Sequence, residues 1–288
     1  MKGIILAGGS GSRLYPLTLS ISKQLLPVFN KPMIYYPLSV LMLAGIREFL
    51  IITAAKDKKL FENLLGDGSD YGILINYLEQ KKPEGIAQAF IIGEKFIGNE
   101  NVALMLGDNI FFGHDLVFLV KEKINTISGA HIFTQHVNNP SEFGICQYDE
   151  NDKIISIVEK PKKFISNQAI TGLYLYDNSV VDVAKNIVPS NRGELEITDV
   201  NKVYLNKKLL SGTRLGRGFA WLDTGTQESL MQASEFIYAI EKRQGLAVGC
   251  LEEIAYNNKW IGKEKIISQQ KKFRNSLYGD YLKKIITS

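Results

Sequence analysis

Short, uninterrupted apolar runs alternate with helix-like segments through the first third of the chain. These runs predict strands at residues 3–7, 49–53, 74–78 and 102–106, the first of them buried. Between them, the spacing of apolar and charged residues predicts helices at residues 33–44, 58–65 and 86–96. Strands that are apolar throughout and alternate with helices are typical of a parallel sheet that is covered on both faces.

After Gly107 the pattern changes to strands joined by shorter polar connections, with a turn at residues 150–153. We expect these strands at residues 132–137, 145–148, 154–158, 173–176 and 214–222. Helical segments are predicted at residues 180–187, 196–205 and 227–242, and the remainder to residue 288 is helical and rich in lysine. The pattern therefore favours one α/β domain with a mixed-sheet region and a helical C-terminal subdomain.

Composition narrows the possible functions. The 288 residues carry 34 Lys and Arg against 30 Asp and Glu, a net charge of +4 with no basic stripe, so we expect no nucleic-acid partner. Cys146 and Cys250 lack the spacing of zinc ligands and suit a reducing cytoplasm, which is the predicted location. No apolar run approaches about 18 residues and the N-terminus lacks a signal-peptide pattern, so no membrane association is expected.

A glycine-rich loop follows the first strand, and it is the first candidate for chemistry. Leu6 is followed by Gly8, Gly9 and Gly11 and then by Arg13. Glycines let backbone N–H groups approach phosphate oxygens closely, although a tight turn would need them too. A leucine stands where a dinucleotide fingerprint has its third glycine, and no acid follows the second strand, which argues against an NAD-binding oxidoreductase. The Gly-Lys-Ser/Thr of a P-loop is also missing.

Three further residues are candidates, each with an ordinary alternative. Lys23 could add a second cation beside the loop, although a single lysine is more often a solvated surface residue. Asp108 ends a predicted strand and Asp223 follows another, positions where carboxylates can hold Mg²⁺ or can cap the next turn or helix. His131 and His136 share one apolar strand, and we interpret them as structural residues.

Several motifs in order resemble the sugar-1-phosphate nucleotidyltransferases, and in particular their thymidylyltransferase members. The motifs are Gly8-Gly9-Ser10-Gly11-Ser12-Arg13-Leu14-Tyr15-Pro16, Lys23-Gln24-Leu25-Leu26-Pro27, Leu106-Gly107-Asp108-Asn109, Val158-Glu159-Lys160-Pro161, residues 192–199 and residues 221–226. The resemblance covers essentially the whole chain, with Ser12 in place of the usual threonine and Tyr15 at a variable position. It implies a Rossmann-like three-layer α/β/α nucleotidyltransferase fold with a mixed, mainly parallel central sheet and a helical C-terminal subdomain.

The resemblance also implies an activity. We expect Mg²⁺-dependent transfer of a thymidylyl group from dTTP to glucose 1-phosphate, the first step towards dTDP-rhamnose and related deoxysugars. The catalytic residues would be Arg13, Lys23, Asp108, Lys160 and Asp223, with Asp108 and Asp223 as metal ligands. The implied nucleotide-binding residues are Leu6, Gly8, Gly9, Ser10, Gly11, Ser12, Arg13, Gln24, Gln80, Pro83, Gly85 and Asp108. The implied sugar-phosphate-binding residues are Asn109, Gly144, Glu159, Lys160, Tyr174 and Arg192.

The resemblance further implies a catalytic domain over residues 1–226 and a helical assembly or regulatory subdomain over residues 227–288. The nucleotide-binding part would span about 1–110 and the sugar-binding part about 111–226. A homotetramer with a second nucleotide site is expected, and its candidate residues are Gly113, His114, Arg217 and Glu253. Two alternatives stay open, a transferase that prefers UTP or another base and a non-catalytic nucleotide-sugar sensor, although the sensor would be expected to lack these charged residues.

Overall fold

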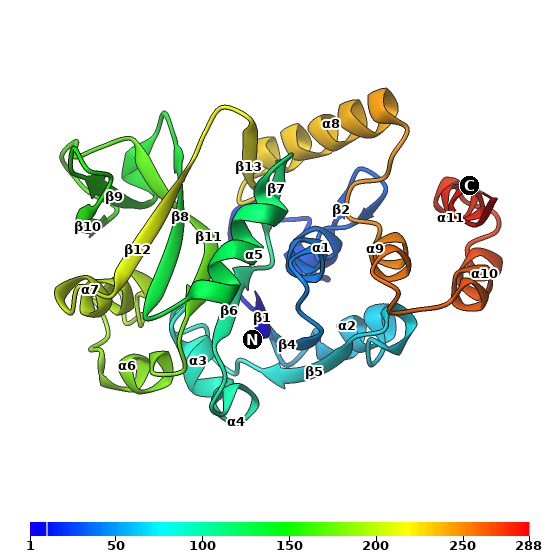
Figure 1. Cartoon of the computed structure of the whole chain (residues 1–288). Coiled ribbons are helices and arrows are strands. Elements are labelled where there is room, and N and C mark those ends of the chain that lie inside the picture. The colour runs from blue at the N-terminus through cyan, green and yellow to red at the C-terminus, as the bar shows by residue number, and fades with distance from the viewer. Residues whose placement is uncertain (10, 288) are drawn as a thin grey trace.

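The computed structural model describes residues 1–9 and 11–287, so the predicted loop residue Ser10 lies outside the described residues. Figure 1 shows the arrangement of its helices and strands. The strands are β1 Lys2–Ala7, β2 Pro27–Val28, β3 Lys31–Pro32, β4 Glu48–Thr53, β5 Leu74–Glu79, β6 Val102–Leu106, β7 Asn109–Gly113, β8 Ala130–His136, β9 Gly144–Tyr148, β10 Ile154–Glu159, β11 Gln168–Tyr176, β12 Leu210–Leu215 and β13 Phe219–Asp223. The α-helices are α1 Tyr35–Leu43, α2 Lys58–Leu65, α3 Gln88–Ile92, α4 Glu94–Ile97, α5 Leu116–Thr126, α6 Val180–Asn186, α7 Ile197–Asn206, α8 Gln227–Gln244, α9 Leu251–Asn257, α10 Lys263–Lys272 and α11 Leu277–Thr287.

The central sheet is mixed, as expected. Its strands follow the order β10-β9-β11-β6-β1-β4-β5. Strand β8 also pairs with β11, and β12 pairs with β8. The β6-β1-β4-β5 half is parallel, whereas β11 runs antiparallel to β6, β8 and β9. Because the carboxyl ends of the parallel strands meet at one edge, residues that follow β1, β5 and β6 are brought together.

Helices cover both faces of this sheet. Successive strand residues point to opposite faces, so Ile5 and Met105 pack with α1, α2, α5 and α9, while Ile4 and Leu104 pack with α3, α4, α6 and α7. This alternation explains why the central strands β1, β4 and β6 are largely apolar, and it confirms the predicted three-layer fold.

The strands predicted at residues 3–7, 49–53, 74–78 and 102–106 are confirmed. The helix predicted at 86–96 is broken into α3 and α4 at Gly93, where an added Cβ would lie 3.0 Å from the Ala89 carbonyl oxygen. The prediction of a single strand at 214–222 is wrong, because that segment contains the end of β12, a turn at residues 217–218 and most of β13. Strand β7 and helix α5 were not predicted.

The C-terminal helices pack in two ways. Helix α8 lies against β2 and β13 and buries Ala233 and Ile237 against Val28, Met33, Tyr36 and Ile110. Helices α9, α10 and α11 surround a small cluster of Cys250, Ile266 and Leu282, and α10 and α11 lie at the opposite end of the molecule from β9 and β10 (Figure 1). The two-part division at residue 226 stays a prediction. Within residues 1–9 and 11–287, no helix is both long and apolar enough to cross a membrane.

Candidate active site

A cavity of about 580 Å³ opens where β1, β5 and β6 end. Of the predicted site residues, those that line it are Leu6, Gly8, Gly9, Arg13, Gln80, Pro83, Gly85, Asp108, Asn109, Gly144, Glu159, Lys160, Tyr174, Arg192 and Asp223. The other described candidates for substrate binding line a smaller adjoining cavity of about 320 Å³, and they are Gly11, Ser12, Lys23 and Gln24. The structure therefore gathers residues from six sequence motifs around one space.

The glycine-rich loop leaves β1 and turns sharply. Gly9 and Gly11 have φ angles of 99° and 60°, the left-handed region that favours glycine. The Gly11 carbonyl oxygen accepts a hydrogen bond from Thr18 Oγ1 at 2.7 Å and another from the Leu14 N–H at 2.9 Å, which holds the turn closed. The exposed Arg13 guanidinium is placed against Gly225, because a Cβ added there would lie 3.3 Å from both terminal nitrogens of Arg13.

Two aspartates are brought together by a two-stranded ribbon. Asp108 directly precedes β7, and Asp223 ends β13, which pairs antiparallel with β7 so that Asp223 lies opposite Asn109. Thr224 donates from its backbone N–H and its Oγ1 to the Asp108 carbonyl oxygen, at 3.2 and 2.8 Å. The Lys23 ammonium group forms a short ion pair with the Asp108 carboxylate. Residues 115 positions apart in sequence thus share one corner of the cavity.

The two carboxyl groups have opposite pKa shifts. Burial would raise the pKa of Asp108, but the charge of Lys23 and hydrogen bonds from Lys23 and Asn109 lower it below the ordinary value. For Asp223, burial and the nearby charge of Asp108 raise the pKa to about 6, and Lys23 and Arg13 offset only part of this. The pair therefore concentrates negative charge that one lysine does not fully neutralise.

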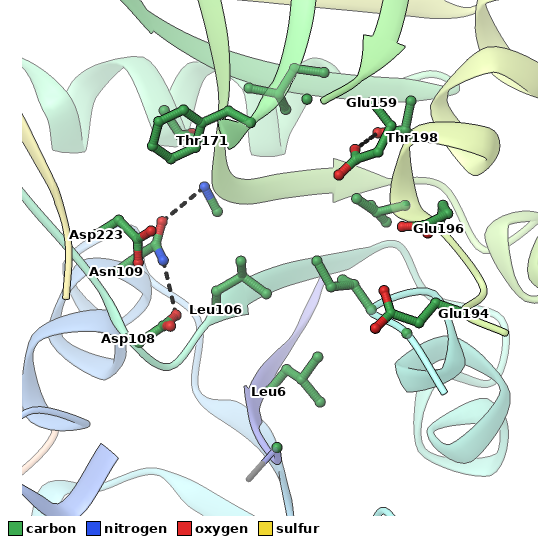
Figure 2. Close-up of a pocket in the computed structure, with 18 of the residues that line it drawn as sticks. Leu6, Leu106, Asp108, Asn109, Glu159, Thr171, Glu194, Glu196, Thr198 and Asp223 are labelled. Carbon is green, nitrogen blue, oxygen red and sulfur yellow. Dashed lines mark hydrogen bonds between the residues drawn. The ribbon is translucent and has the colours of Figure 1, made fainter. Parts of the chain in front are cut away.

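Asn109 connects the aspartate corner to strands β11 and β13. Its Oδ1 accepts from Trp221 Nε1 at 2.6 Å and from the Gly172 N–H at 3.1 Å, and its Nδ2 donates to Asp108 Oδ1 at 3.0 Å. Figure 2 shows Asp108, Asn109 and Asp223 on one side of the cavity, with Leu6 and Leu106 on its floor. Asn109 was predicted as a sugar-phosphate contact, and here its carboxamide also orients the Asp108 carboxylate. The sequence alone indicates Trp221 only as the first residue of the motif at residues 221–226.

The facing wall is rich in carboxylates. Glu159 ends β10 and accepts a hydrogen bond from Thr198 Oγ1 at 2.5 Å, a contact that Figure 2 marks. The Arg192 guanidinium is within 2.8 Å of Glu196, 3.2 Å of Glu194 and 3.8 Å of Glu159. These carboxylates hold the arginine at the rim of the cavity. Thr198, Glu194 and Glu196 were not predicted, and only their position in the motif at residues 192–199 could have indicated them.

Lys160 follows Glu159 in an unusual backbone conformation. Its φ is 42°, a left-handed value that is costly for a residue with a Cβ. The Lys160 N–H donates to the Phe143 carbonyl oxygen at 3.0 Å, which holds the turn, and the exposed lysine lines the cavity beside Arg192. Gly144 opens the neighbouring strand β9, and a Cβ there would meet Glu159 Oε2 at 3.1 Å. Tyr174, on β11, is 4% exposed and closes the wall behind them.

The segment after β5 completes the cavity. The Gln80 N–H donates to the Thr53 carbonyl oxygen at 2.8 Å, which extends the strand pairing by one residue. Gly85 has a φ of 104°, and a Cβ there would lie 2.4 Å from the Leu195 carbonyl oxygen. No larger residue fits this approach of two backbones. The turn is therefore tied to the loop that carries Arg192.

The donor set suits a hard divalent cation that completes its coordination with phosphate oxygens. Asp108 and Asp223 supply carboxylate oxygens, and the pKa of Asp223 is raised by its burial and by the negative charge of Asp108. Among residues 1–9 and 11–287, no cluster of three or more His, Cys, Asp or Glu residues could by itself enclose a metal ion. Mg²⁺ needs only one or two protein carboxylates when a substrate supplies phosphates, so these residues fit it.

Comparison with known proteins identifies the family of this chain. The sequence profile of the nucleotidyl transferase family matches residues 2–239. The chain belongs to the nucleotidyl transferase family. Family members with high identity include a glucose-1-phosphate thymidylyltransferase from Neisseria meningitidis, 55% identical over 99% of both chains. Another, from Mycolicibacterium smegmatis and of the same name, is 51% identical over 99% of both chains.

Solved structures in the family share the fold. A crystal structure of a putative glucose-1-phosphate thymidylyltransferase from Bacillus anthracis superposes with a TM-score of 0.76 at 44% identity. The match covers 82% of this chain and 94% of that one. A UDP-glucose pyrophosphorylase in complex with UDP-glucose matches with a TM-score of 0.73 at 25% identity, covering 83% of this chain and 98% of that one.

The residues predicted for a second nucleotide site fall into two places in the fold. Gly113 ends β7 opposite Phe219 of β13, so His114 and Arg217 lie near the same end of the ribbon. Glu253 lies on α9, and its Oε2 accepts a hydrogen bond from the Tyr281 hydroxyl at 2.8 Å. The second site therefore stays a prediction.

Proposed function

We propose that this protein transfers a thymidylyl group from dTTP to glucose 1-phosphate and releases pyrophosphate, forming dTDP-glucose. The observation that carries the proposal is the two-sided cavity, which places the glycine-rich loop, Lys23 and the aspartate pair opposite Glu159 and Lys160. Relatives named glucose-1-phosphate thymidylyltransferase, 50–55% identical over 99% of this chain, support the same reaction.

The bond changes need no general base. An oxygen of the sugar phosphate attacks the α-phosphorus of the nucleotide, and the bond from that phosphorus to the bridging oxygen breaks as pyrophosphate leaves. The second pKa of a phosphate monoester is about 6, so the attacking group is already largely ionised at neutral pH. His131 accordingly has a structural role, since it is buried and its ring nitrogens lie 2.7 Å from Ser211 Oγ and 3.0 Å from Thr213 Oγ1.

The chain's own cations position and neutralise the phosphates. Arg13 and Lys23 flank the glycine-rich loop and would contact the triphosphate and the departing pyrophosphate. Lys160, with Arg192 beside it, would hold the sugar phosphate in line with the α-phosphorus. Holding both reactants in one geometry and neutralising their charge is the main source of rate enhancement in phosphoryl transfer.

The proposal includes Mg²⁺ held by Asp108 and Asp223. When bound there, the ion would neutralise charge on the α-phosphate oxygens and help orient the triphosphate. Asn109 keeps Asp108 facing the cavity, and the Lys23 ion pair keeps that carboxylate ionised. The remaining proposals are the homotetramer, the second nucleotide site and the place in deoxysugar synthesis.

The proposed function can be tested with a panel of nucleotides. Purified protein is incubated with glucose 1-phosphate, Mg²⁺ and dTTP, UTP, dCTP or ATP, and pyrophosphate release gives kcat/KM for each. We expect the highest value for dTTP, with no release when glucose 1-phosphate is omitted. A clear preference for another base would contradict the thymidylyl assignment, and no release with any nucleotide would contradict the activity itself.

A further inference from the structure

Three polar side chains at the end of β5 form a hydrogen-bonded series that leads away from the cavity. Gln80, which is 6% exposed, donates from Nε2 to Gln88 Oε1 at 2.7 Å. Gln88 in turn donates from its own Nε2 to Glu84 Oε2 at 2.7 Å. Gln80 lines the cavity, whereas Gln88 and Glu84 stand behind it.

The Glu84 carboxylate, at the end of the series farthest from the cavity, determines which way the two amide groups are turned. A carboxylate accepts hydrogen bonds and cannot donate them when ionised, so Gln88 must turn its NH₂ group towards Glu84. The Gln88 carbonyl oxygen then faces Gln80, and it also accepts from the Glu84 backbone N–H at 3.3 Å. Both contacts favour the same orientation of the Gln88 amide. Gln80 must consequently present its NH₂ group to Gln88.

The opposite end of the Gln80 amide faces the glycine-rich loop. A Cβ added to Gly8 would lie 2.3 Å from Gln80 Oε1, and Gly8 and Gln80 both line the cavity. No hydrogen-bond donor to this oxygen is recorded among residues 1–9 and 11–287. The second NH₂ contact of Gln80, to the Gly85 carbonyl oxygen, is long at 3.5 Å. The group that Gln80 offers to a ligand is therefore a hydrogen-bond acceptor.

We propose that Glu84 and Gln88 are specificity-determining positioning residues. They hold the Gln80 carbonyl oxygen towards the cavity, where it accepts a hydrogen bond from the N3–H of thymine or uracil. Cytosine has an unprotonated ring N3 and would place an acceptor against this acceptor. The inference deepens the proposed function and rests on it, because it takes the base of the nucleotide substrate as the ligand of Gln80.

The backbone around Glu84 is fixed by the neighbouring loop, which keeps this orientation in place before the substrate arrives. The Leu195 N–H donates to the Glu84 carbonyl oxygen at 2.7 Å, and the Ala87 N–H donates to the Leu195 carbonyl oxygen at 3.2 Å. If the Gln80 amide rotated by half a turn, its carbonyl oxygen would face that of Gln88. Two acceptors would then be buried against each other without a proton between them.

The decisive variant is Gln88→Lys, which replaces an acceptor with a group that only donates. A lysine at position 88 can pair with Glu84, which the Gln88 side chain already reaches at 2.7 Å, and would require Gln80 to turn its carbonyl oxygen away from the cavity. We expect the ratio of kcat/KM for dTTP over dCTP to fall by at least about 10-fold, mainly through KM for the nucleotide. The ratio for dTTP over dUTP should stay constant, because both bases carry N3–H.

A matched exchange variant separates orientation from structure. In the double variant Glu84→Gln/Gln88→Glu, a carboxylate at position 88 accepts from Gln80 Nε2 and an amide at position 84 donates to it, with the net charge unchanged. We expect it to keep the wild-type preference for dTTP over dCTP. Gln88→Met, which neither donates strongly nor accepts strongly, should lower the preference and serves if the lysine variant fails to fold.

The outcomes can be told apart from failure of the proposed function. If wild-type protein does not use dTTP with glucose 1-phosphate, the proposed function is contradicted. If wild type prefers dTTP but Gln88→Lys and Gln88→Met keep the dTTP over dCTP ratio within about twofold, only the role of Gln88 is overturned. An exchange variant that loses the preference as fully as Gln88→Lys overturns the assigned direction of the series.

Discussion

The cavity and the C-terminal helices each contain two neighbouring carboxyl groups, and the two pairs are held differently. In the cavity, Asp108 and Asp223 lie beside Lys23, and the side chain of Asp108 remains 17% exposed. On α9, Glu252 and Glu253 follow each other, and each accepts a hydrogen bond from a tyrosine hydroxyl of α11. Glu252 is fully buried.

The two carboxyl pairs differ in the charge of the side chains that contact them. Burial raises the pKa of Glu252 and Glu253, and the hydrogen bonds from their neutral tyrosine partners offset only part of this shift. In the cavity, Lys23 lowers the pKa of Asp108, which keeps one carboxylate charged next to an open space. A buried carboxyl group is therefore not by itself a functional one. A charged partner and access to a cavity distinguish the pair suited to cation binding from the pair that joins helices.

The largest expected effect comes from removing charge in the cavity. Asp108→Asn and Asp223→Asn should each reduce kcat by on the order of 100-fold or more, since each removes an anion from the proposed metal site. The melting temperature should change little. Mg²⁺-dependent pyrophosphate release measures the effect, with Asp182→Asn on the exposed side of α6 as the control. Near-normal turnover in either variant would remove that aspartate from the metal site.

The next effect should be on stability alone. Tyr278→Phe removes the hydroxyl that donates to Glu252, and an unpartnered buried polar group costs about 1–3 kcal/mol. We expect a lower free energy of unfolding in denaturant titrations, with kcat and KM close to wild type. Leu277→Ala, at a position 76% exposed next to Tyr278, is the matched control and should unfold like wild type. A large loss of kcat in Tyr278→Phe would show that the two carboxyl pairs are coupled.

A smaller effect should appear in the pH dependence of stability. The pKa of Glu252 is raised above its ordinary value of 4.5, so its contribution is complete below that pH and is lost as pH rises through the folded-state pKa. Glu252→Gln cannot titrate. The free energy of unfolding of this variant minus that of wild type should therefore increase as pH rises from about 4.5 through neutral values. A difference that stays flat over this range would mean that Glu252 is ionised in the folded protein.

Local patterning was enough to predict much of the fold. The four parallel strands of the first 106 residues are confirmed because β1, β4 and β6 are almost entirely apolar, as a sheet covered on both faces requires, and the edge strand β5 is still mostly apolar. The pattern failed where long-range pairing decides. β7 follows directly after Asp108, and its pairing with β13 cannot be read from a segment of five residues. The predicted helix at 86–96 divides at Gly93, which packs tightly against Ile4, since a Cβ added there would lie 3.0 Å from Ile4 Cδ1 and from the Ala89 carbonyl oxygen.

The candidate site divides in the same way. Arg13, Lys23, Asp108 and Asp223 could be proposed from their motifs, because each stands in a loop or at a strand end where ligands bind. The hydrogen bonds that hold these residues in place could not be predicted from the motifs. Nothing in the local sequence shows that Asn109 receives a hydrogen bond from Trp221, since 112 positions separate them.

By itself, the sequence determined the alternation of strands and helices, the glycine-rich loop and the kinds of charged residue available, because these depend on neighbours along the chain. Only the tertiary structure decided which charges are neutralised. It placed Lys23 against Asp108 and left Asp223 with a pKa of about 6. It also oriented the Gln80 amide through the hydrogen bonds that link it to Gln88 and Glu84. Burial and distance control the strength of electrostatic and hydrogen-bond interactions, and both exist only once distant segments have packed together.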